Sequence, residues 1–538
     1  MPAYSLALSL LITGPLLAPG YLLLRDAVST PQSYLTDAAL GLSEAAPRAL
    51  PQDFFIALTS AVLDGGVVVK VLLVAGLWVA GWGAARLAST VLGSGLSGQF
   101  IAATLAIWNP FVAERLLQGH WSLLVGYGCL PWVAVCVLRL RAGSGMGPAW
   151  GLAFWTALAG LTPTGLMLAA TVALVCVAAP GTGWRRLRVA AVALGSAVLA
   201  ATPWLVAAAV GGAVAAPESP AGVHAFAARA EPGLATLGSL AGLGGIWNGD
   251  AVPGSRTTLF AVVATAVLLG IVALGLPVVV RNRTAAALLI LAAAAVLIPA
   301  AMATGPGLAF VDATIRGVPG LGVVRDGQKW VALAMPGYVL AAAAAPVTLR
   351  RLRAPLAASA AVSCAALIAV LPDLAWGVGN QVRAVHYPQS WAAAAAQINA
   401  DPRPVVALPP DSMREFSWAP AGPVLDPLPR WLRAEVLTTG DLSIGGQTVP
   451  GEGVRARAVQ DLVLSGASDQ QLAEAGVGWV VRESDRDVSV HRVGGSAPTA
   501  SQRGVMTAAH LVWLGVLVGG AAGMAVSAWR GRRGSETR

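Results

Sequence analysis

The feature that most constrains this chain is a series of long apolar segments that recurs from the N-terminus to about residue 375. Each is roughly twenty residues long, which is the length a helix needs to cross the hydrocarbon core of a bilayer. The series stops over 376–505, and one further apolar segment follows near 506–528. Because 56% of the residues are hydrophobic and only 11% are charged, the sequence predicts a multi-pass membrane protein.

Short clusters of arginine stand between the apolar segments, such as Arg139 with Arg141 and Arg281 with Arg283. Positive charge beside a span stays preferentially on the cytoplasmic side. Placing every cluster there gives an all-α bundle of about twelve transmembrane helices in the plasma (inner) membrane, with both termini cytoplasmic and the long polar loops outside. Because the clusters account for the net charge of +9, we expect no nucleic-acid partner. The predicted spans are 5–24, 66–85, 97–112, 121–138, 147–162, 164–180, 189–210, 258–280, 284–304, 330–347, 355–375 and 506–528.

The region 376–505 differs in pattern from the apolar series. HYPQSWAAAAAQINADPRPVVALPPD predicts a helix, a strand and a turn, and QQLAEAGVGWVVRESDRDVSVHRV predicts a helix and two short strands. We therefore expect a transmembrane module at 1–375 with about eleven helices, a small extracytoplasmic α/β domain at 376–505, and a last helix with a basic tail at 506–538. The α/β region carries no nucleophile elbow, phosphate loop or dinucleotide fingerprint, which favours a lid or carbohydrate-binding platform over an independent enzyme.

The cysteines and histidines do not indicate a metal site. All four cysteines lie inside apolar segments, where a thiol behaves as a small hydrophobic group. The five histidines are scattered without the spacing of zinc ligands. We therefore predict no metal ligands among the protein's side chains.

The stretch LLLRDAV places Arg25 and Asp26 at the predicted outer end of the first helix. A charge at the edge of a bilayer is poorly solvated and tends to be kept for a purpose. A carboxylate there, near a basic side chain, could accept a proton from an incoming hydroxyl, which makes Asp26 the candidate catalytic base and Asp37 the reserve candidate. The alternative is that Arg25 and Asp26 form an interfacial anchor pair.

A second candidate segment is IWNPFVAERLLQGHWSLLVGYGCLPW, residues 107–132. Aromatic residues are expected near any membrane interface. This segment also has hydrogen-bonding side chains, namely Glu114, Arg115 and His120, and His120 is followed by the aromatic Trp121. Hydrogen-bonding and stacking groups together suit a sugar. A plain interfacial helix is the alternative.

A third candidate segment is VVRDGQKW, just before a late predicted span. Arg325 and Lys329 fall on its predicted outer side, where positive charge runs against the orientation rule. Two cations at the outer surface can bind the phosphate of a lipid, with Arg as a bidentate donor and Lys as a point charge. The alternative is a structural ion pair with Asp326.

Together these segments resemble the GT-C superfamily of integral-membrane glycosyltransferases, which use polyprenyl-phosphate sugars on the outer side of the membrane. The resemblance rests on LLLRDAV, on VVRDGQKW, and on the α/β region before the last apolar segment. The alanine-, glycine- and arginine-rich chain and the stretch PQSYLTDAALGLSEAAPRALPQD are similar to actinobacterial arabinofuranosyltransferases and mannosyltransferases. The paired acids often seen in the first loop of relatives are absent.

The resemblance implies an inverting transfer of arabinofuranose or mannose from a polyprenyl-phosphate donor to a cell-envelope glycan or glycolipid. It makes Asp26 the base and Arg325, Lys329 and Arg25 the groups that bind the donor phosphate. It establishes no cofactor and leaves a divalent cation open. The side chains expected to bind the sugar or the acceptor are Glu114, Arg115, His120 and Trp121.

Two other functions remain open from the sequence. A transporter or flippase of lipid-linked sugars would use the same phosphate clamp, but ionisable residues along its translocation path should lie deep in the spans, where this chain has few. A non-catalytic scaffold for cell-wall assembly with a GT-C-like fold is the other.

Overall fold

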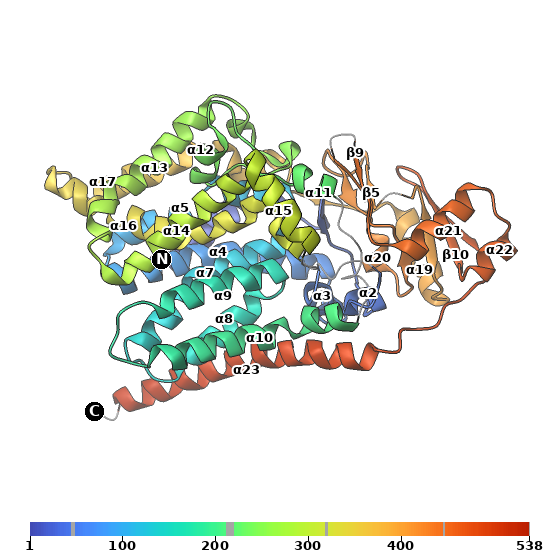
Figure 1. The fold of residues 1–538 in the computed structure, drawn as a ribbon, viewed down its shortest axis with the longest axis horizontal. Helices are drawn as coiled ribbons and strands as arrows, with labels where there is room; N and C mark the ends of the chain where they lie inside the picture. Colours follow the sequence, from blue (N-terminus) through green and yellow to red (C-terminus); the bar gives the residue numbers. More distant parts are fainter. Residues whose placement is uncertain (45–48, 211–219, 318–320, 411, 445–446, 537–538) are drawn as a thin grey trace.

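The computed structural model describes residues 1–44, 49–210, 220–317, 321–410, 412–444 and 447–536. Long helices lie side by side to form a bundle, and a smaller region of strands and short helices stands at one end of it (Figure 1). Both marked chain ends lie in the half of the molecule away from this smaller region. The α/β region therefore stands at one end of the helical bundle, and both chain termini lie toward the other.

Eight helical segments of the described residues are long and apolar enough to cross a membrane. This confirms a multi-pass membrane protein but gives fewer spans than the twelve expected from hydropathy. A bent pair, α17 (Leu356–Ala369) followed by Pro372–Asn380 with a 75° change of direction, is either a broken ninth span or a re-entrant loop. The eight are α4 (Gly65–Leu92), α5 with α6 (Leu96–Ile107, Pro110–Leu117), α7 (Trp121–Arg141), α10 (Arg186–Val210), α13 (Phe260–Val279), α14 (Arg283–Met302), η6 with α16 (Gly327–Ala334, Met335–Arg351) and α23 (Arg503–Glu536).

The first predicted span, 5–24, is shorter than expected. Helix α1 (Pro2–Thr13) ends in the 3-10 turn η1 (Gly14–Leu17), and Tyr21–Leu24 forms strand β1 instead of a further helical turn. Pro19 and Gly20 explain the break, because proline disfavours a helical conformation before it and Gly20 takes a φ of 118° that other residues avoid. The end of helix 1 therefore lies before Arg25, not beside it.

The bundle packs closely through small residues. A Cβ on Gly128 of α7 would lie 2.2 Å from the carbonyl oxygen of Gly76 on α4, and one on Gly275 of α13 would lie 1.7 Å from that of Ala341 on α16. Such approaches are what small residues permit between membrane helices. The remaining helical segments are α2 (Asp37–Leu40), α3 (Gln52–Thr59), α8 (Gly147–Ala159), α9 (Pro163–Val177), α11 (Pro220–Ala225), α12 (Thr236–Ala241), η3 (Gly249–Ala251), η4 (Gly254–Arg256), α15 (Gly305–Gly317), η5 (Leu321–Val324), η7 (Pro372–Leu374) and α18 (Ala375–Asn380).

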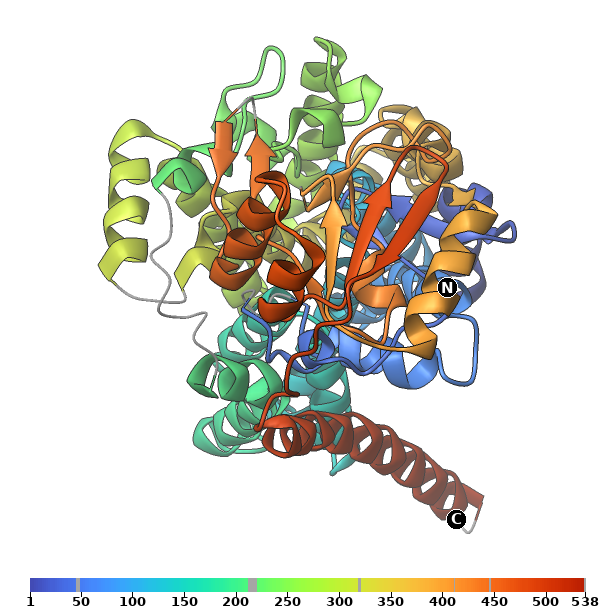
Figure 2. The ribbon, with the colours of Figure 1, turned by 90° about the vertical axis from the view of Figure 1, so that its right-hand side faces the viewer.

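The smaller region is built on a four-stranded sheet of order β11-β10-β4-β7, which faces the viewer in Figure 2. Strand β4 is parallel to both β10 and β7, and β11 is antiparallel to β10. Val405 of β4 packs with α19 on one face and Val406 packs with α21 and α22 on the other, as the alternation of a strand requires. The elements are α19 (Gln389–Ala400), β4 (Val405–Leu408), β5 (Met413–Arg414), β6 (Val424–Leu425), α20 (Leu428–Trp431), β7 (Val436–Leu437), β8 (Leu442–Ile444), β9 (Gln447–Val449), α21 (Val454–Leu464), α22 (Asp469–Glu474), β10 (Trp479–Glu483) and β11 (Val488–Arg492).

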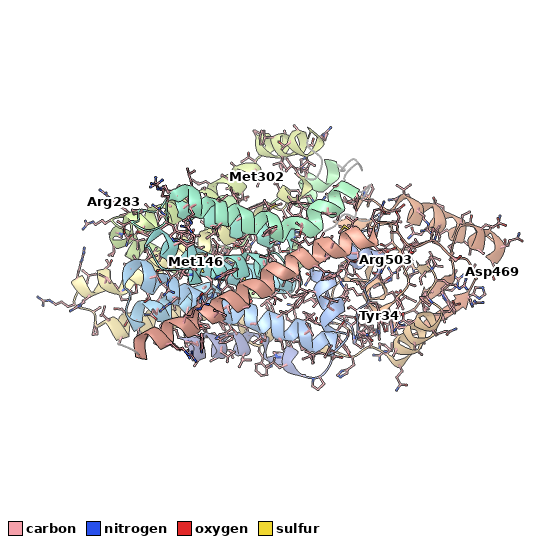
Figure 3. The ribbon with its side chains drawn as sticks, turned by 90° about the horizontal axis from the view of Figure 1, so that it is seen from below. Tyr34, Met146, Arg283, Met302, Asp469 and Arg503 are labelled. Atoms are coloured by element: carbon pink, nitrogen blue, oxygen red, sulfur yellow. The ribbon has the colours of Figure 1, made fainter. Side chains whose placement is uncertain are left out.

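A short N-terminal hairpin connects the two parts. Strand β1 (Tyr21–Leu24) pairs with β2 (Ala27–Val28) on one side and with β3 (Ala384–Val385) on the other. The Tyr387 hydroxyl donates to the carbonyl of Ser29 over 2.9 Å. The chain then leaves the α/β region through α23, which runs along the outside of the bundle from Arg503 (Figure 3). The hairpin that carries Asp26 thus lies where the bundle and the α/β region meet.

Candidate active site

Arg25 and Asp26 form the two-residue turn between β1 and β2. Leu24 pairs with Ala27, so only these two residues connect the strands. Arg25 has a φ of 49°, a left-handed conformation that two-residue hairpin turns require and that arginine rarely adopts. The turn keeps this strained residue because its neighbours fix it from several sides.

Arg25 is held by both parts of the molecule. Its guanidinium donates to the carbonyl of Leu117 over 2.6 Å and to that of Asp250 over 2.5 Å, and its own carbonyl accepts from the backbone N–H of Leu425 over 2.9 Å. The residue is 3% exposed. Its side chain is therefore committed inside the protein and does not face a ligand, in contrast to the phosphate contact expected from the sequence.

Asp26 points the other way and meets His120. The Asp26 side chain is 37% exposed, and its Oδ2 lies 2.8 Å from Nε2 of His120. Oδ2 also accepts from Nε2 of Gln118 over 3.2 Å. Among the described residues no hydrogen bond reaches Oδ1, so that oxygen can accept from a ligand. Gln118 in turn accepts from Nδ2 of Asn248 over 2.8 Å.

A buried ion pair lies behind His120. Arg115 grips Asp326 with two parallel bonds of 2.9 and 3.1 Å, and its Nη1 lies 3.1 Å from Nδ1 of His120. Arg115 also donates to the side-chain oxygen of Gln328. Lys329, whose side chain is 24% exposed, lies 3.6 Å from Asp326. The second and third candidate segments therefore form one connected cluster with Asp26 at its exposed edge.

Glu114 lies deeper in the same cluster and is fully buried. Its carboxylate accepts from the backbone N–H groups of Gly245 and Ile246 over 3.0 and 3.2 Å, and from Nε2 of Gln328 over 2.9 Å. Such bonds stabilise a buried carboxylate and position the loop around it. Glu114 thus holds the loop that carries Asn248 rather than facing a ligand itself.

The two aspartates of the cluster are ionised at neutral pH. Removal from water raises the pKa of Asp26, but the hydrogen bonds from His120 and Gln118 and the charge of Lys329 outweigh this and leave the pKa below its usual value. Burial also raises the pKa of Asp326, and the charges of Arg115 and Lys329 lower it further than burial raises it. Both groups can therefore act as carboxylates at neutral pH.

Of three other predicted residues, two lie apart from this cluster and the third, Arg325, lies beside it. Asp37 accepts from the guanidinium of Arg503 and from the backbone N–H of Ala500 over 3.1 Å, at the start of α23. Trp121 is 4% exposed and packs in the main core of the bundle. The guanidinium of Arg325 stacks over the ring of Phe226 at 4.3 Å and lines a small cavity with apolar residues of α11, α14 and α15.

The loop 229–256 was not predicted to contribute to the site. It supplies Asn248 and the carbonyl of Asp250, and a buried ion pair between Glu231 and Arg256 holds it from inside, with a bond of 2.8 Å from Arg256 Nε to Glu231. The only sequence signal is WNGD at residues 247–250, a cluster of polar groups in a long external loop. Without the fold, nothing in that stretch connects it to Asp26.

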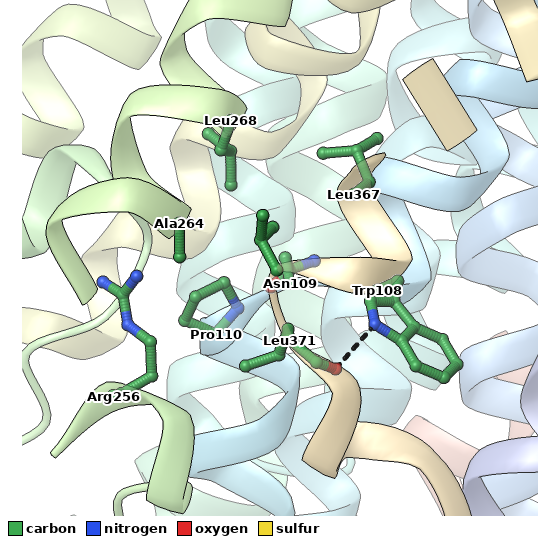
Figure 4. A pocket seen from close by; sticks show the side chains of 9 residues that line it. Trp108, Asn109, Pro110, Arg256, Ala264, Leu268, Leu367 and Leu371 are labelled. Atoms are coloured by element: carbon green, nitrogen blue, oxygen red, sulfur yellow. Dashed lines mark hydrogen bonds between the residues drawn. The ribbon is translucent and has the colours of Figure 1, made fainter. Parts of the chain in front are cut away.

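A small pocket lies next to this ion pair, lined by Trp108, Asn109, Pro110 and Arg256 (Figure 4). Trp108 donates to the carbonyl of Leu371 across it, over 2.9 Å. Its other lining is aliphatic, and none of the cluster around Asp26 faces it. Within the described part of the chain, no three His, Cys, Asp or Glu side chains gather closely enough to hold a metal ion.

Comparison with known proteins gives a match in structure. No protein-family model matches the sequence, and no curated protein matches it. Two cryo-EM structures of a variant of arabinofuranosyltransferase AftD from Mycobacteria match with TM-scores of 0.56 and 0.53, at 20% and 17% sequence identity. The chain shares the fold of this membrane enzyme. The matches cover 90% of the chain but only 37% and 36% of the solved chains, so it spans little more than a third of their length.

The fold of the chain therefore resembles that of a mycobacterial arabinofuranosyltransferase, the class of protein to which the sequence was similar. At this identity the likeness concerns the arrangement of the helices and not the substrate. The residues that decide the chemistry have to be argued from the cluster itself.

Proposed function

We propose that this chain is a membrane glycosyltransferase that transfers a sugar, arabinofuranose or mannose, from a polyprenyl-phosphate donor to a cell-envelope glycan or glycolipid. The transfer would occur on the extracytoplasmic face with inversion at the anomeric carbon. One observation carries the proposal: Asp26 is an ionised, partly exposed carboxylate that is held by His120 and Gln118 and lies in the field of Lys329. The likeness to the fold of AftD supports the same class of reaction.

Asp26 is assigned as the general base. As the acceptor hydroxyl attacks the anomeric carbon, a new C–O bond forms, the bond from that carbon to the phosphate oxygen breaks, and the hydroxyl proton passes to Oδ1 of Asp26. The attacking hydroxyl becomes acidic only as the new bond forms, so a carboxylate of low pKa is a sufficient base. The bonds to Oδ2 fix the carboxylate while this happens.

Lys329 and Arg325 are assigned to the departing polyprenyl phosphate, which leaves with the electron pair of the broken bond. The ammonium of Lys329 is partly exposed beside Asp326 and acts on Asp26 through its charge. Arg325 lines the neighbouring apolar cavity, where a guanidinium can meet a phosphate while the isoprenoid chain stays in apolar surroundings. Preorganised cations of this kind stabilise the charge that develops on the leaving group.

The sugar would lie against Asn248, which is half-buried and linked to Asp26 through Gln118. Glu114 and Arg115 are fully buried and act from behind, so they are proposed to support these contacts. Arg25 is proposed to hold the hairpin in place of binding phosphate. The α/β region is proposed to guide the acceptor glycan, since it stands beside the hairpin on the same end of the bundle.

The test is transfer of radiolabelled sugar from polyprenyl-phosphate arabinose and, separately, polyprenyl-phosphate mannose to a synthetic oligosaccharide in membranes. We expect activity with one donor, and a loss of about 10²–10⁴-fold in Asp26→Asn, the usual contribution of a general base. Asp37→Asn is the matched variant and should keep the chemistry, because Asp37 binds Arg503 away from the cluster.

The other outcomes are equally informative. Activity that survives Asp26→Asn but disappears in Asp37→Asn would move the base to Asp37. A folded protein that transfers from neither donor would overturn the enzyme assignment in favour of a scaffold or a transporter of lipid-linked sugars.

A further inference from the structure

His120 connects the exposed Asp26 to the buried ion pair, and both of its ring nitrogens are engaged. Nε2 lies 2.8 Å from Asp26, and Nδ1 lies 3.1 Å from Nη1 of Arg115. Arginine has only donors, so Nδ1 must be the acceptor of that bond. A neutral imidazole with an accepting Nδ1 carries its proton on Nε2. His120 therefore donates to Asp26 and has no lone pair left for a substrate.

This geometry decides between two roles that a histidine–aspartate pair can have. In one, histidine is the base and aspartate orients it; in the other, aspartate is the base and histidine donates to it. The first needs a ring nitrogen that faces the substrate with a free lone pair. In this protein Arg115 occupies that nitrogen from the buried side.

We propose that Arg115 is a positioning residue that holds His120 in the Nε2–H tautomer, so that His120 stays a neutral donor and Asp26 alone takes the acceptor proton. The inference rests on the proposed function for its role in transfer, but the tautomer itself is a property of the free protein.

Arg115 is rigidly placed for this task. Its four terminal N–H groups serve the two oxygens of Asp326, Gln328 and His120, and the residue is fully buried. The planar guanidinium cannot turn without breaking the paired bonds to Asp326. A lysine at this position would keep the charge but lose the fixed direction of the donor.

Burial, together with the like charges of Lys329 and Arg115, favours the neutral form of His120. The charged groups that face it are Asp26 from the hairpin, Arg115 from α6, and Asp326 and Lys329 from the segment at η6. Burial lowers the pKa of His120, Asp26 raises it, and the like charges of Lys329 and Arg115 lower it, so the pKa ends below its usual value. A proton on Nδ1 would also point directly at the N–H of Arg115.

The first test needs no substrate. We would record the ¹⁵N NMR spectrum of histidine-labelled protein in lipid nanodiscs from about pH 6 to 8, where an ordinary histidine titrates. His120→Gln assigns the signal by difference. In the neutral ring we expect a protonated Nε2 and an unprotonated Nδ1, and in Arg115→Lys a mixture of tautomers or a shift toward the cationic form.

Arg141→Lys is the matched control for removing a buried guanidinium. Arg141 is buried in α7 and donates to the backbone carbonyl of Ala179 over 3.1 Å, with no contact to the cluster. The Arg141→Lys variant should therefore leave the NMR signal of His120 unchanged. A protonated Nδ1 in the wild type, or an unaltered signal in Arg115→Lys, would overturn the proposal.

The second test is the transfer assay with substitutions of His120. In His120→Gln the amide N–H can take the place of the Nε2–H group, but glutamine can neither titrate nor act as a base. The shorter side chain in His120→Asn cannot reach Asp26, and His120→Ala has no hydrogen-bond donor. We expect His120→Gln to stay within about tenfold of wild type, with an unchanged acid limb of its pH profile, and His120→Asn and His120→Ala to lose about 10²-fold through a misplaced Asp26.

A folded His120→Gln protein as inactive as His120→Ala would show that the imidazole itself moves the proton. The two proposals fail separately. Inactive wild-type protein with the expected tautomer overturns the function alone, and active protein with the other tautomer overturns the role of Arg115 alone.

Discussion

At the scale of single residues, Arg25 and Asp26 have similar sequence signals but differ in burial. Arg25 and Asp26 were both predicted to face a ligand, yet Arg25 is 3% exposed and the Asp26 side chain is 37% exposed. The sequence identifies residues that are costly to keep near a membrane, and this selected Asp26, Arg115 and His120. The sequence cannot show which side chain of the turn points into the protein and which points toward solvent. That depends on partners distant in the chain, such as the carbonyls of Leu117 and Asp250, which accept from Arg25.

A prediction at this scale concerns Asp326 in acid. Burial raises the pKa of Asp326 in the folded protein, but the charges of Arg115 and Lys329 outweigh this and lower it. The ionised carboxylate therefore stabilises the fold above the unfolded pKa of about 4, and this stabilisation is lost as the pH falls through the folded pKa. Asp326→Asn should lower the midpoint of thermal unfolding at pH 7 by leaving Arg115 uncompensated, and should flatten its fall in acid. Asp312→Asn, which removes a more exposed ion pair with Arg316, should change little. Melting curves of the detergent-solubilised protein from pH 3 to 7 check this, and parallel acid limbs in Asp326→Asn and wild type would contradict it.

At the scale of elements, hydropathy identified most of the helices but could not tell a strand from a continued helix. Tyr21–Leu24 is as apolar as the helix before it, and a short apolar run does not by itself distinguish the two structures. In the α/β region the helix and strands predicted around 386–411 and 470–493 are observed, because their apolar periods and turn residues are clear. The pairing of β1 with β3 was out of reach, since nothing local indicates a partner so distant in the chain.

Gly119 offers a test of how tightly the hairpin is seated. It has a φ of 82°, and a Cβ there would lie 2.3 Å from the backbone nitrogen of Ala27 and 2.4 Å from the carbonyl of Leu24. Gly119→Ala should therefore displace the hairpin and lower transfer by about 10²-fold, the effect of misplacing a catalytic group by about 1 Å. Gly93→Ala is the matched control, because Gly93 has a φ of 62° with open space around it and should lose only about 1–2 kcal/mol of stability. Equal activity in the two variants, measured in the transfer assay, would mean that the hairpin yields to the added methyl group.

At the scale of the whole molecule, the two ends of the bundle differ in kind. Met146 and Arg283 lie in the half of the bundle away from the α/β region, and Asp469 lies in the α/β region itself (Figure 3). Two of the arginine clusters that predicted the cytoplasmic side, at 139–141 and 281–283, belong to the same loops as Met146 and Arg283. The predicted topology would place these loops in the cytoplasm and the cluster around Asp26 on the outer side.

Labelling from each side of the membrane tests this topology. Met146 is half exposed and the Asp469 side chain is 62% exposed, so cysteines at these positions can react, whereas Cys129, Cys136 and Cys176 are buried. We expect a membrane-impermeant maleimide to label Asp469→Cys in intact cells and Met146→Cys only after the cells are opened. A signal from Met146→Cys in intact cells, above that of the unmodified protein, would invert the predicted orientation.

The pairing of the N-terminal hairpin with later segments also sets the order in which the protein becomes competent during synthesis. The proposed base, Asp26, is synthesised before the segments that hold its hairpin: strand β1 pairs with Ala384–Val385, and the carbonyl of Arg25 accepts from the N–H of Leu425. Contacts between segments so far apart form late, after the intervening chain has been inserted. A nascent chain would therefore contain Asp26 long before its hairpin is held in place. A prematurely terminated product would lack the segments that position the Asp26 carboxylate.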